Sequence, residues 1–245
     1  MKIYLCIDDT DNIDSIGTGE ILENLCAALH TAGFGEGGFV TRHQLYIHED
    51  IAYTSHNSSM CCEVVINDKD LDKVIAFAGA YLQQHSADGS DPGLCIAAAD
   101  LDKIDELVNF GLRAKQEVLT QDAAFAVAKL YGCHVHLSNH GGNGDGVIGA
   151  LAGVGLRFCG MDGKVKGKLQ PEIPGERMSL TDFCHKYGIQ RVIDENNNEI
   201  SGSEDVIFAE ETKAIFRYGQ TTVCVKKTAD GWQPLGRKEI KAKCL

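Results

Sequence analysis

The stretch MKIYLCIDDTDN, residues 1–12, joins an apolar run directly to a cluster of acidic residues. Residues 1–7 contain a single charged side chain, Lys2, and the turn-forming residues Asp8, Asp9 and Thr10 follow at once. Short apolar runs that end in polar turn residues are typical of buried strands. We therefore expect a buried first strand that ends at a loop of aspartates.

The residues that follow alternate between helical and strand patterns. Apolar residues recur at helical spacing in residues 18–32 and 71–82, and short apolar segments typical of strands occupy residues 39–47, 60–66 and 94–98. The resulting order, strand, helix, strand, strand, helix, strand, is that of a ferredoxin-like split βαβ unit. The fold class that the sequence predicts is therefore α+β.

A change in composition near residues 160–175, where Gly, Lys and Pro dominate, predicts a domain boundary. Before it, residues 101–110 and 121–130 have helical spacing, and residues 132–137 have a strand pattern. After it, Ser179 and Asp182 are spaced as a helix-capping pair, and two alternating segments, 215–218 and 222–226, flank a turn. We expect an α+β region over residues 1–160 and a small β-rich module over residues 161–245.

Composition and charge narrow the class of protein. The formal charge of −12 disfavours a dominant nucleic-acid role, because nonspecific nucleic-acid binding relies on Lys and Arg. The ten cysteines include no C-x-x-C pair, so we expect reduced, mostly buried thiols in a cytoplasmic protein. Neither a leader peptide nor an apolar run of ~18 residues occurs, so we expect neither export nor membrane insertion.

Four aspartates, Asp8, Asp9, Asp11 and Asp14, fall directly after the first strand. Such a cluster is costly by mutual repulsion unless a cation lies among the charges. Mg²⁺ suits this loop because it takes oxygen ligands and commonly combines one or two carboxylates with substrate phosphates. Strand alternation makes Asp8 and Asp9 point in opposite directions, so we expect one of them to face the pocket and the other to support the loop. Thr18 supplies a hydroxyl at the start of the first helix, where backbone amides favour phosphate. The alternative is that these aspartates are turn formers and a helix cap.

A glycine-rich turn, HGGNGDGVIG, occupies residues 140–149 between a strand and an apolar helix. Gly144, Gly146 and Gly149 form a G-x-G-x-x-G pattern, but the acidic residue of a dinucleotide fold and the lysine of a P-loop are missing. We expect the exposed amides of this turn to bind phosphate; a purely structural tight turn is the alternative. The nearby His134 and His136, expected on one strand face, lack the partners of a metal site.

The middle loop, residues 41–59, is dense in hydrogen-bonding side chains. Arg42 is the residue in it that best suits a phosphate contact, because its guanidinium binds phosphate through two parallel hydrogen bonds. A surface loop without function is the alternative.

Three segments carry a family resemblance: IDDTDNIDSIGT from Ile7, YTSHNSS from Tyr53, and GGNGDGVIGALAGVG from Gly141. In them the chain resembles the N-terminal half of the archaeal tRNA agmatinylcytidine synthetase family. The resemblance implies a kinase-like domain with an accompanying ferredoxin-like domain acting on ATP, and activation of a cytidine carbonyl by phosphorylation before an amine attacks it. Asp8, Asp9 and Asp11 would then hold magnesium and ATP phosphates, and Thr18 matches the family's threonine.

The chain departs from that family pattern in three ways. Gly19 stands where the family has a second threonine, and Thr54-Ser55-His56 stands where it has Lys-Thr-Arg. The family's OB-fold and zinc ribbon grip the tRNA, and we expect no counterpart of them in these 245 residues, which contain no C-x-x-C pair. We therefore expect ATP and magnesium chemistry on a smaller substrate, with tRNA doubtful as a partner.

Three hypotheses about function follow from the sequence. The first is an ATP- and magnesium-dependent phosphoryl-transfer enzyme, in which Asp9 and Thr18 act at the reacting phosphate. The second is a nonenzymatic module that senses nucleotide through the same pocket. The third is an aspartyl-phosphate hydrolase that uses Asp9 and Asp11. The sequence predicts neither the acceptor nor an oligomeric state.

Overall fold

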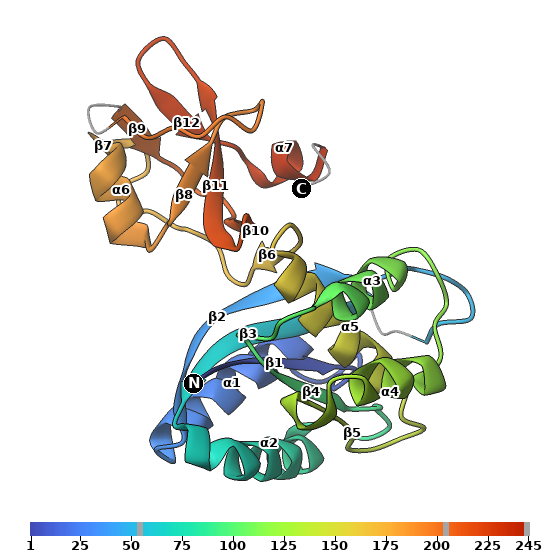
Figure 1. The fold of residues 1–245 in the computed structure, drawn as a ribbon. Coiled ribbons are helices and arrows are strands. Elements are labelled where there is room, and N and C mark those ends of the chain that lie inside the picture. Colours follow the sequence, from blue (N-terminus) through green and yellow to red (C-terminus); the bar gives the residue numbers. More distant parts are fainter. Residues whose placement is uncertain (53–55, 203–205, 243–245) are drawn as a thin grey trace. The chain divides into compact units, whose positions relative to one another are not determined.

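The computed structural model describes residues 1–52, 56–202 and 206–242. The chain forms two compact units, Met1–Cys159 and Gly160–Leu245 (Figure 1). In the described residues no helix is long and apolar enough to cross a membrane.

The first unit contains five strands and five α-helices in its described part. They are β1 (Lys2–Asp8), α1 (Thr18–Thr31), β2 (Gly35–Gln44), β3 (Ser58–Ile66), α2 (Leu71–His85), β4 (Gly93–Ala98), α3 (Asp105–Arg113), α4 (Gln121–Lys129), β5 (Val135–Asn139) and α5 (Gly146–Cys159). Short 3-10 turns precede α2 and β5, at Asp68–Asp70 and Gly132–His134.

The sheet of this unit has the order β5-β4-β1-β3-β2, with every neighbouring pair antiparallel. The first six elements therefore follow the predicted sequence of strands and helices, and β1 and β2 are separated by β3, as in a split βαβ unit. The α+β class is confirmed. This topology puts the end of β1 in the interior of the sheet, beside the start of β4.

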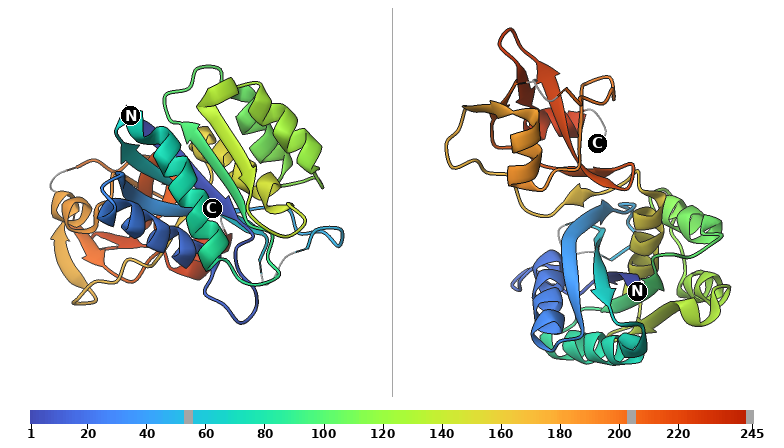
Figure 2. Two further views of the ribbon diagram at one scale, coloured as in Figure 1. Left: turned by 90° about the horizontal axis from the view of Figure 1, so that it is seen from below. Right: turned by 60° about the vertical axis from the view of Figure 1, so that its left-hand side comes forward.

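Helices cover both faces of the sheet (Figures 1 and 2). The side chains of Ile3, Leu5 and Ile7 pack toward α1 and α2, whereas Tyr4 and Cys6 pack toward α3, α4 and α5. Alternation along a strand puts residues 4, 6 and 8 on one face. The carboxylate at the end of β1, Asp8, therefore lies on the α5 face.

Helix α5 is the buried centre of this second face. Its residues 149–157 are all buried, and its glycines allow close approach to two neighbours. A Cβ at Gly153 would lie 2.3 Å from Cys6 Sγ on β1, and one at Gly155 would lie 1.9 Å from the carbonyl oxygen of Leu107 on α3. The small residues after the glycine-rich turn thus let α5 fit between the sheet and α3.

Two predicted boundaries were wrong. Strand β2 begins at Gly35 rather than at residue 39, because the glycine-rich stretch that ends α1 continues as strand with an irregularity between Gly37 and Val40. The segment predicted as a strand from residue 132 begins as a 3-10 turn, and β5 starts only at Val135. Glycine is a weak local signal because it fits turns and irregular strands equally well.

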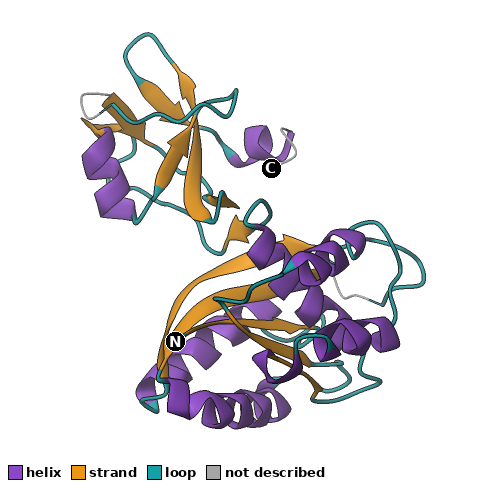
Figure 3. Ribbon diagram, in the orientation of Figure 1, coloured by secondary structure: helices purple, strands orange, loops and turns teal. Residues whose placement is uncertain are grey.

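The second unit is rich in short strands in its described part (Figure 3). It contains β6 (Lys164–Val165), β7 (Glu176–Ser179), α6 (Leu180–Tyr187), β8 (Arg191–Ile193), β9 (Val206–Ala209), β10 (Ile215–Arg217), β11 (Gln220–Lys227), β12 (Trp232–Pro234) and α7 (Arg237–Ala242). The predicted cap is confirmed, since Ser179 Oγ accepts a hydrogen bond from the Asp182 amide at 3.0 Å. The predicted pair of strands around a turn is also confirmed as β10 and β11.

Candidate functional site

Asp8 is the last residue of β1, and its carboxylate lies against the backbone of α5. A Cβ at Gly149 would lie 1.6 Å from Asp8 Oδ2, so the carboxylate occupies the space where a side chain would stand. Burial, together with the neighbouring charge of Asp9, raises the pKa of Asp8 to about 8. An Asp with such a pKa is held where its charged form lacks a counter-charge.

Asp9 follows in a left-handed backbone conformation, with φ 50°. Asp is one of the few non-glycine residues that adopt this region, at a cost in free energy. Burial, together with the charges of Asp91, Asp11 and Asp145, raises the pKa of Asp9 to about 6. Asp9 therefore faces carboxylates from two other segments of the chain.

Asp91 and Asp145 are members of this carboxylate cluster that the sequence analysis did not select. Asp91 precedes β4 and accepts a hydrogen bond from the Asn143 amide, which ties its loop to the glycine-rich turn. Asp145 lies in that turn and accepts from Gln121 Nε2 at 2.8 Å. Asp145 lies inside the glycine-rich turn, so the sequence around it could have identified it as a site residue. Asp91 carries no local signal, because only the β1–β4 pairing brings it to Asp9.

Thr18 and Asp11 are in contact where the aspartate loop joins α1. Thr18 is buried at the first residue of α1, and its Oγ1 donates a hydrogen bond to Asp11 Oδ1 at 3.0 Å. A threonine hydroxyl beside a carboxylate is oriented, and its oxygen gains electron density as the proton is drawn toward the acid. The structure thus joins two residues that the sequence analysis selected.

Thr10 supplies a polar atom inside the same loop. Its side chain is fully buried, and within the described part of the chain its hydroxyl has no hydrogen-bond partner. Its carbonyl oxygen accepts from the Ala87 amide at 2.9 Å, which fastens the aspartate loop to the loop after α2. A buried hydroxyl without a partner is costly and rare.

The cluster offers the oxygen ligands that a hard cation prefers. Carboxylates and hydroxyls suit Mg²⁺, and a cation would relieve the repulsion that helps to raise the pKa values of Asp8 and Asp9. Among the described residues, no group of three or more His, Cys, Asp or Glu side chains is placed to hold a metal ion. Magnesium binding by Asp8, Asp9 and Asp11 therefore stays a prediction.

The glycine-rich turn is more tightly packed than its sequence indicates. Gly144 is buried with φ 95°, and a Cβ at Gly146 would lie 2.0 Å from the carbonyl oxygen of Asp91. Several backbone N–H groups of the turn already donate hydrogen bonds to oxygens of the protein. They are those of Gly141, Asn143, Asp145, Val147 and Ile148. Phosphate binding by Gly144, Gly146 and Gly149 therefore stays a prediction, and the packing of these glycines is a finding.

Arg42 lies on β2, with β3 between it and β1. Its Nε donates to Ser58 Oγ at 2.9 Å, and its guanidinium also contacts Gln44 Oε1 at 3.4 Å. These contacts hold Arg42 along the edge of the middle loop, and its phosphate role stays a prediction. The same loop contains Thr54-Ser55-His56, which stands where the family has Lys-Thr-Arg. Thr54 and Ser55 lie outside the described residues, and His56 is exposed.

The histidines after α4 differ from their predicted arrangement. His134 lies in the 3-10 turn rather than on the strand, so it does not share a face with His136 through strand alternation. Instead, Ser138 Oγ lies 2.9 Å from His136 Nε2 and 2.8 Å from His140 Nε2. Burial lowers the pKa of both His136 and His140.

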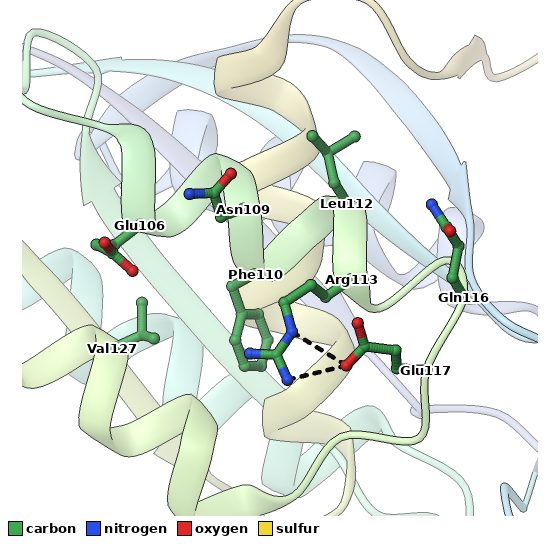
Figure 4. A pocket seen from close by; sticks show the side chains of 8 residues that line it. All are labelled: Glu106, Asn109, Phe110, Leu112, Arg113, Gln116, Glu117 and Val127. Carbon is green, nitrogen blue, oxygen red and sulfur yellow. Dashed lines mark hydrogen bonds and ion pairs between the residues drawn. The ribbon is translucent and has the colours of Figure 1, made fainter.

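A cavity of about 450 Å³ opens between α3 and α4 (Figure 4). Phe110 contributes to its wall, and Arg113 and Glu117 form an ion pair of 2.9 Å at its side. None of the carboxylates of the candidate site lines it. The cavity is therefore separate from the chemistry at the end of β1.

Comparisons with known proteins agree with this fold. No protein-family model and no curated protein sequence matches the chain, but solved structures do. A tRNA fluorescent labeling enzyme matches with a TM-score of 0.55 at 21% identity, covering 78% of this chain and 46% of that one. The apo form of TiaS, a tRNA agmatidine synthetase, matches with a TM-score of 0.55 at 19% identity, covering 87% and 51%.

The chain shares the fold of TiaS. A complex of TiaS with tRNA and ATP also matches, with a TM-score of 0.55 at 21% identity, covering 83% of this chain and 50% of that one. The chain spans about half the length of the TiaS structures that it matches. The predicted resemblance is thus confirmed for the fold. The doubt about tRNA receives no support from these neighbours, because TiaS was crystallised with tRNA.

Proposed function

We propose that the chain is an ATP- and magnesium-dependent phosphoryl-transfer enzyme, with its site at the end of β1. The observation that carries the proposal is the gathering of carboxylates around Asp9, where burial and then the charges of Asp91, Asp11 and Asp145 raise the pKa of Asp9. A magnesium ion with the phosphates of ATP supplies the missing positive charge and neutralises charge that develops during transfer.

Asp8 and Asp9 are the residues that would hold the ion. Asp8 is fixed by β1 and by the backbone of α5 at Gly149, and Asp9 by its left-handed conformation. Both carboxylates are therefore placed before any ligand arrives, and less reorganisation is needed on binding. Asp91 and Asp145 add negative charge around Asp9 and would strengthen its affinity for a cation.

Thr18 and Asp11 are the pair that would face the transferred phosphoryl group. The 3.0 Å hydrogen bond orients the Thr18 hydroxyl and gives it a nearby proton acceptor. Thr18 also stands in the first turn of α1, where backbone amides favour an anion. Thr18 therefore contacts or accepts phosphate in our proposal, and Asp11 positions it.

Two acceptors suit this chemistry, a small molecule and a tRNA nucleobase. The small acceptor is our proposal, because residues 1–159, which contain the site, carry 22 Asp and Glu against 9 Lys and Arg. A surface of that charge repels nucleic acid. The tRNA acceptor is favoured by the TiaS complex with tRNA and ATP. It is also favoured by residues 160–245, where 14 Lys and Arg balance 13 Asp and Glu.

The decisive experiment is a magnesium-dependent ATP turnover assay on the full chain. We expect ATP consumption with magnesium, little without it, and loss of activity in Asp9→Asn. Asp14→Asn, an exposed aspartate of the same loop, is the matched control and should keep the activity. Binding of ATP and magnesium without turnover would favour the sensing module, and a trapped phospho-aspartate at Asp9 would favour the hydrolase.

A filter-binding titration with bulk tRNA at about 150 mM salt, near physiological ionic strength, separates the two acceptors. We expect no saturable binding below micromolar concentration for the small-molecule enzyme. Tight, saturable binding that weakens steeply with salt would instead make tRNA the substrate.

A further inference from the structure

Two cysteines from different elements lie in contact on the α1 face of the first unit. Cys26 Sγ on α1 and Cys62 Sγ on β3 are 3.2 Å apart. A disulfide needs the two sulfurs to approach to about 2.05 Å, so only a small movement separates the thiols from a covalent bond. The other close partner of Cys26 is a glycine of β2.

Gly37 makes room for this contact. A Cβ at Gly37 would lie 2.7 Å from Cys26 Cβ and 2.8 Å from Cys26 Sγ, closer than real Cβ atoms come. Gly37 also stands at the irregularity of β2, between Gly37 and Val40. The absence of a side chain at this position lets the sulfur of Cys26 reach the sheet.

The two thiols differ in access and in proton affinity. Cys26 is 9% exposed and Cys62 is fully buried. The hydrogen bond between the two thiols lowers the pKa of Cys26 against the effect of burial, whereas the same bond and burial raise the pKa of Cys62. A thiolate is the reactive form of cysteine. Cys26 is therefore the sulfur that an oxidant meets first, and Cys62 is positioned to resolve the product.

We propose that Cys26 and Cys62 form a reversible disulfide when the protein meets a peroxide. The Cys26 thiolate attacks one oxygen of hydrogen peroxide; the O–O bond breaks, and with one proton taken up the products are a sulfenic acid and water. Cys62 then attacks the Cys26 sulfur, the S–O bond breaks, and a second water leaves with the proton of Cys62. Two thiols are oxidised and one peroxide is reduced.

This disulfide would join α1 to the centre of the sheet. Disulfides in reducing compartments are commonly transient and redox-sensing, and this one closes a loop between residues 36 positions apart. Closing a loop of that size restricts the unfolded chain and stabilises the folded one. Because α1 begins at Thr18, oxidation would rigidify the helix that enters the candidate site, although the proposal does not depend on the chemistry of that site.

The test uses the full chain, fully reduced and then exposed to hydrogen peroxide. The free thiols are then blocked with N-ethylmaleimide in denaturant, so that buried thiols also react, and we expect two of the ten cysteines to escape labelling. Peptide mapping without reductant should find Cys26 linked to Cys62, and dithiothreitol should release them. Hydrogen exchange in α1 should slow, and Tm should rise by several degrees.

Variants identify the order of events. In Cys62→Ala the sulfenic acid at Cys26 should persist and be trapped by dimedone, and Cys133→Ser, which removes an exposed thiol, should leave the disulfide unchanged. The wild-type peptide map needs no variant to fold. A disulfide between other cysteines, or a Cys26–Cys62 link that forms only after the protein is unfolded, would overturn the proposal.

Discussion

The carboxylate of Asp8 fills the position that a side chain would take at Gly149, with Oδ2 1.6 Å from an ideal Cβ there. One residue ends the central strand of the first sheet, and the other lies in the first turns of the buried helix α5. The glycine therefore has a packing role besides the predicted phosphate binding, because it leaves the space that the Asp8 carboxylate fills.

Alanine at Gly149 should disturb this place directly. We expect Gly149→Ala to lower the free energy of unfolding by about 1–3 kcal/mol, as overpacking in a core does, and to weaken ATP binding because Asp8 must move. Gly38→Ala is the control, since its Cβ would meet only the carbonyl oxygen of Glu63 at 3.4 Å. Urea unfolding and calorimetric titration measure both effects. Equal stability of the two variants would contradict the packing argument.

Valine at Gly146 should destabilise the protein before any ligand is added. There is no space for a Cβ beside Asp91 and Gly93, so the helix or the loop must shift by more than a methyl group. We expect a fall in Tm of the apo protein that corresponds to about 3 kcal/mol or less. Differential scanning calorimetry of the apo variant gives the answer. An unchanged Tm together with at least tenfold weaker ATP binding would instead support the predicted binding of phosphate by the turn.

The substitution Asp9→Asn should remove the magnesium-dependent binding of ATP and relieve the repulsion between the carboxylates around Asp9. Asn accepts the left-handed backbone conformation of this position, so the loop keeps its shape. We expect the thermal shift with ATP and magnesium to vanish, and the apo protein at pH 8 to gain about 1–2 kcal/mol, which is less than the shift of Asp9 implies because solvent screens a partly exposed charge. A ligand-induced shift equal to that of wild type would remove Asp9 from the metal site.

The stability of the apo protein should fall as pH rises from about 4 to 8. The folded protein keeps a proton on Asp8 up to about pH 8 and on Asp9 up to about pH 6, whereas an unfolded aspartate loses its proton near pH 4. The folded state thus binds more protons in this window, and the free energy of unfolding decreases by at most about 1.4 kcal/mol per pH unit for each such group.

Urea unfolding at several pH values without metal measures this slope. Asp8→Asn should flatten it most between pH 6 and 8, and magnesium with ATP should reduce it in the wild type. Stability that rises across the same range would show that the two carboxyls are not held in the protonated form.

Local chemistry was enough to predict much of this protein. The apolar run of β1, the helical spacing of α1 and α2, and the Ser179 cap all depend on residues close together in the chain, and so does the cluster of aspartates after β1. Where glycine decided a boundary, as at β2, local reasoning failed because glycine accepts strand, turn and irregular conformations.

Tertiary structure alone decided which distant residues complete the site. The pairing of β1 with β4 brings Asp91 to Asp9, and the packing of α5 on the sheet puts Gly149 beneath Asp8. The packing of α1 on the other face of the sheet brings Cys26 to Cys62. Strand register and helix packing are set by the fit of the whole core, so contacts between residues far apart in the sequence leave no pattern in either local segment.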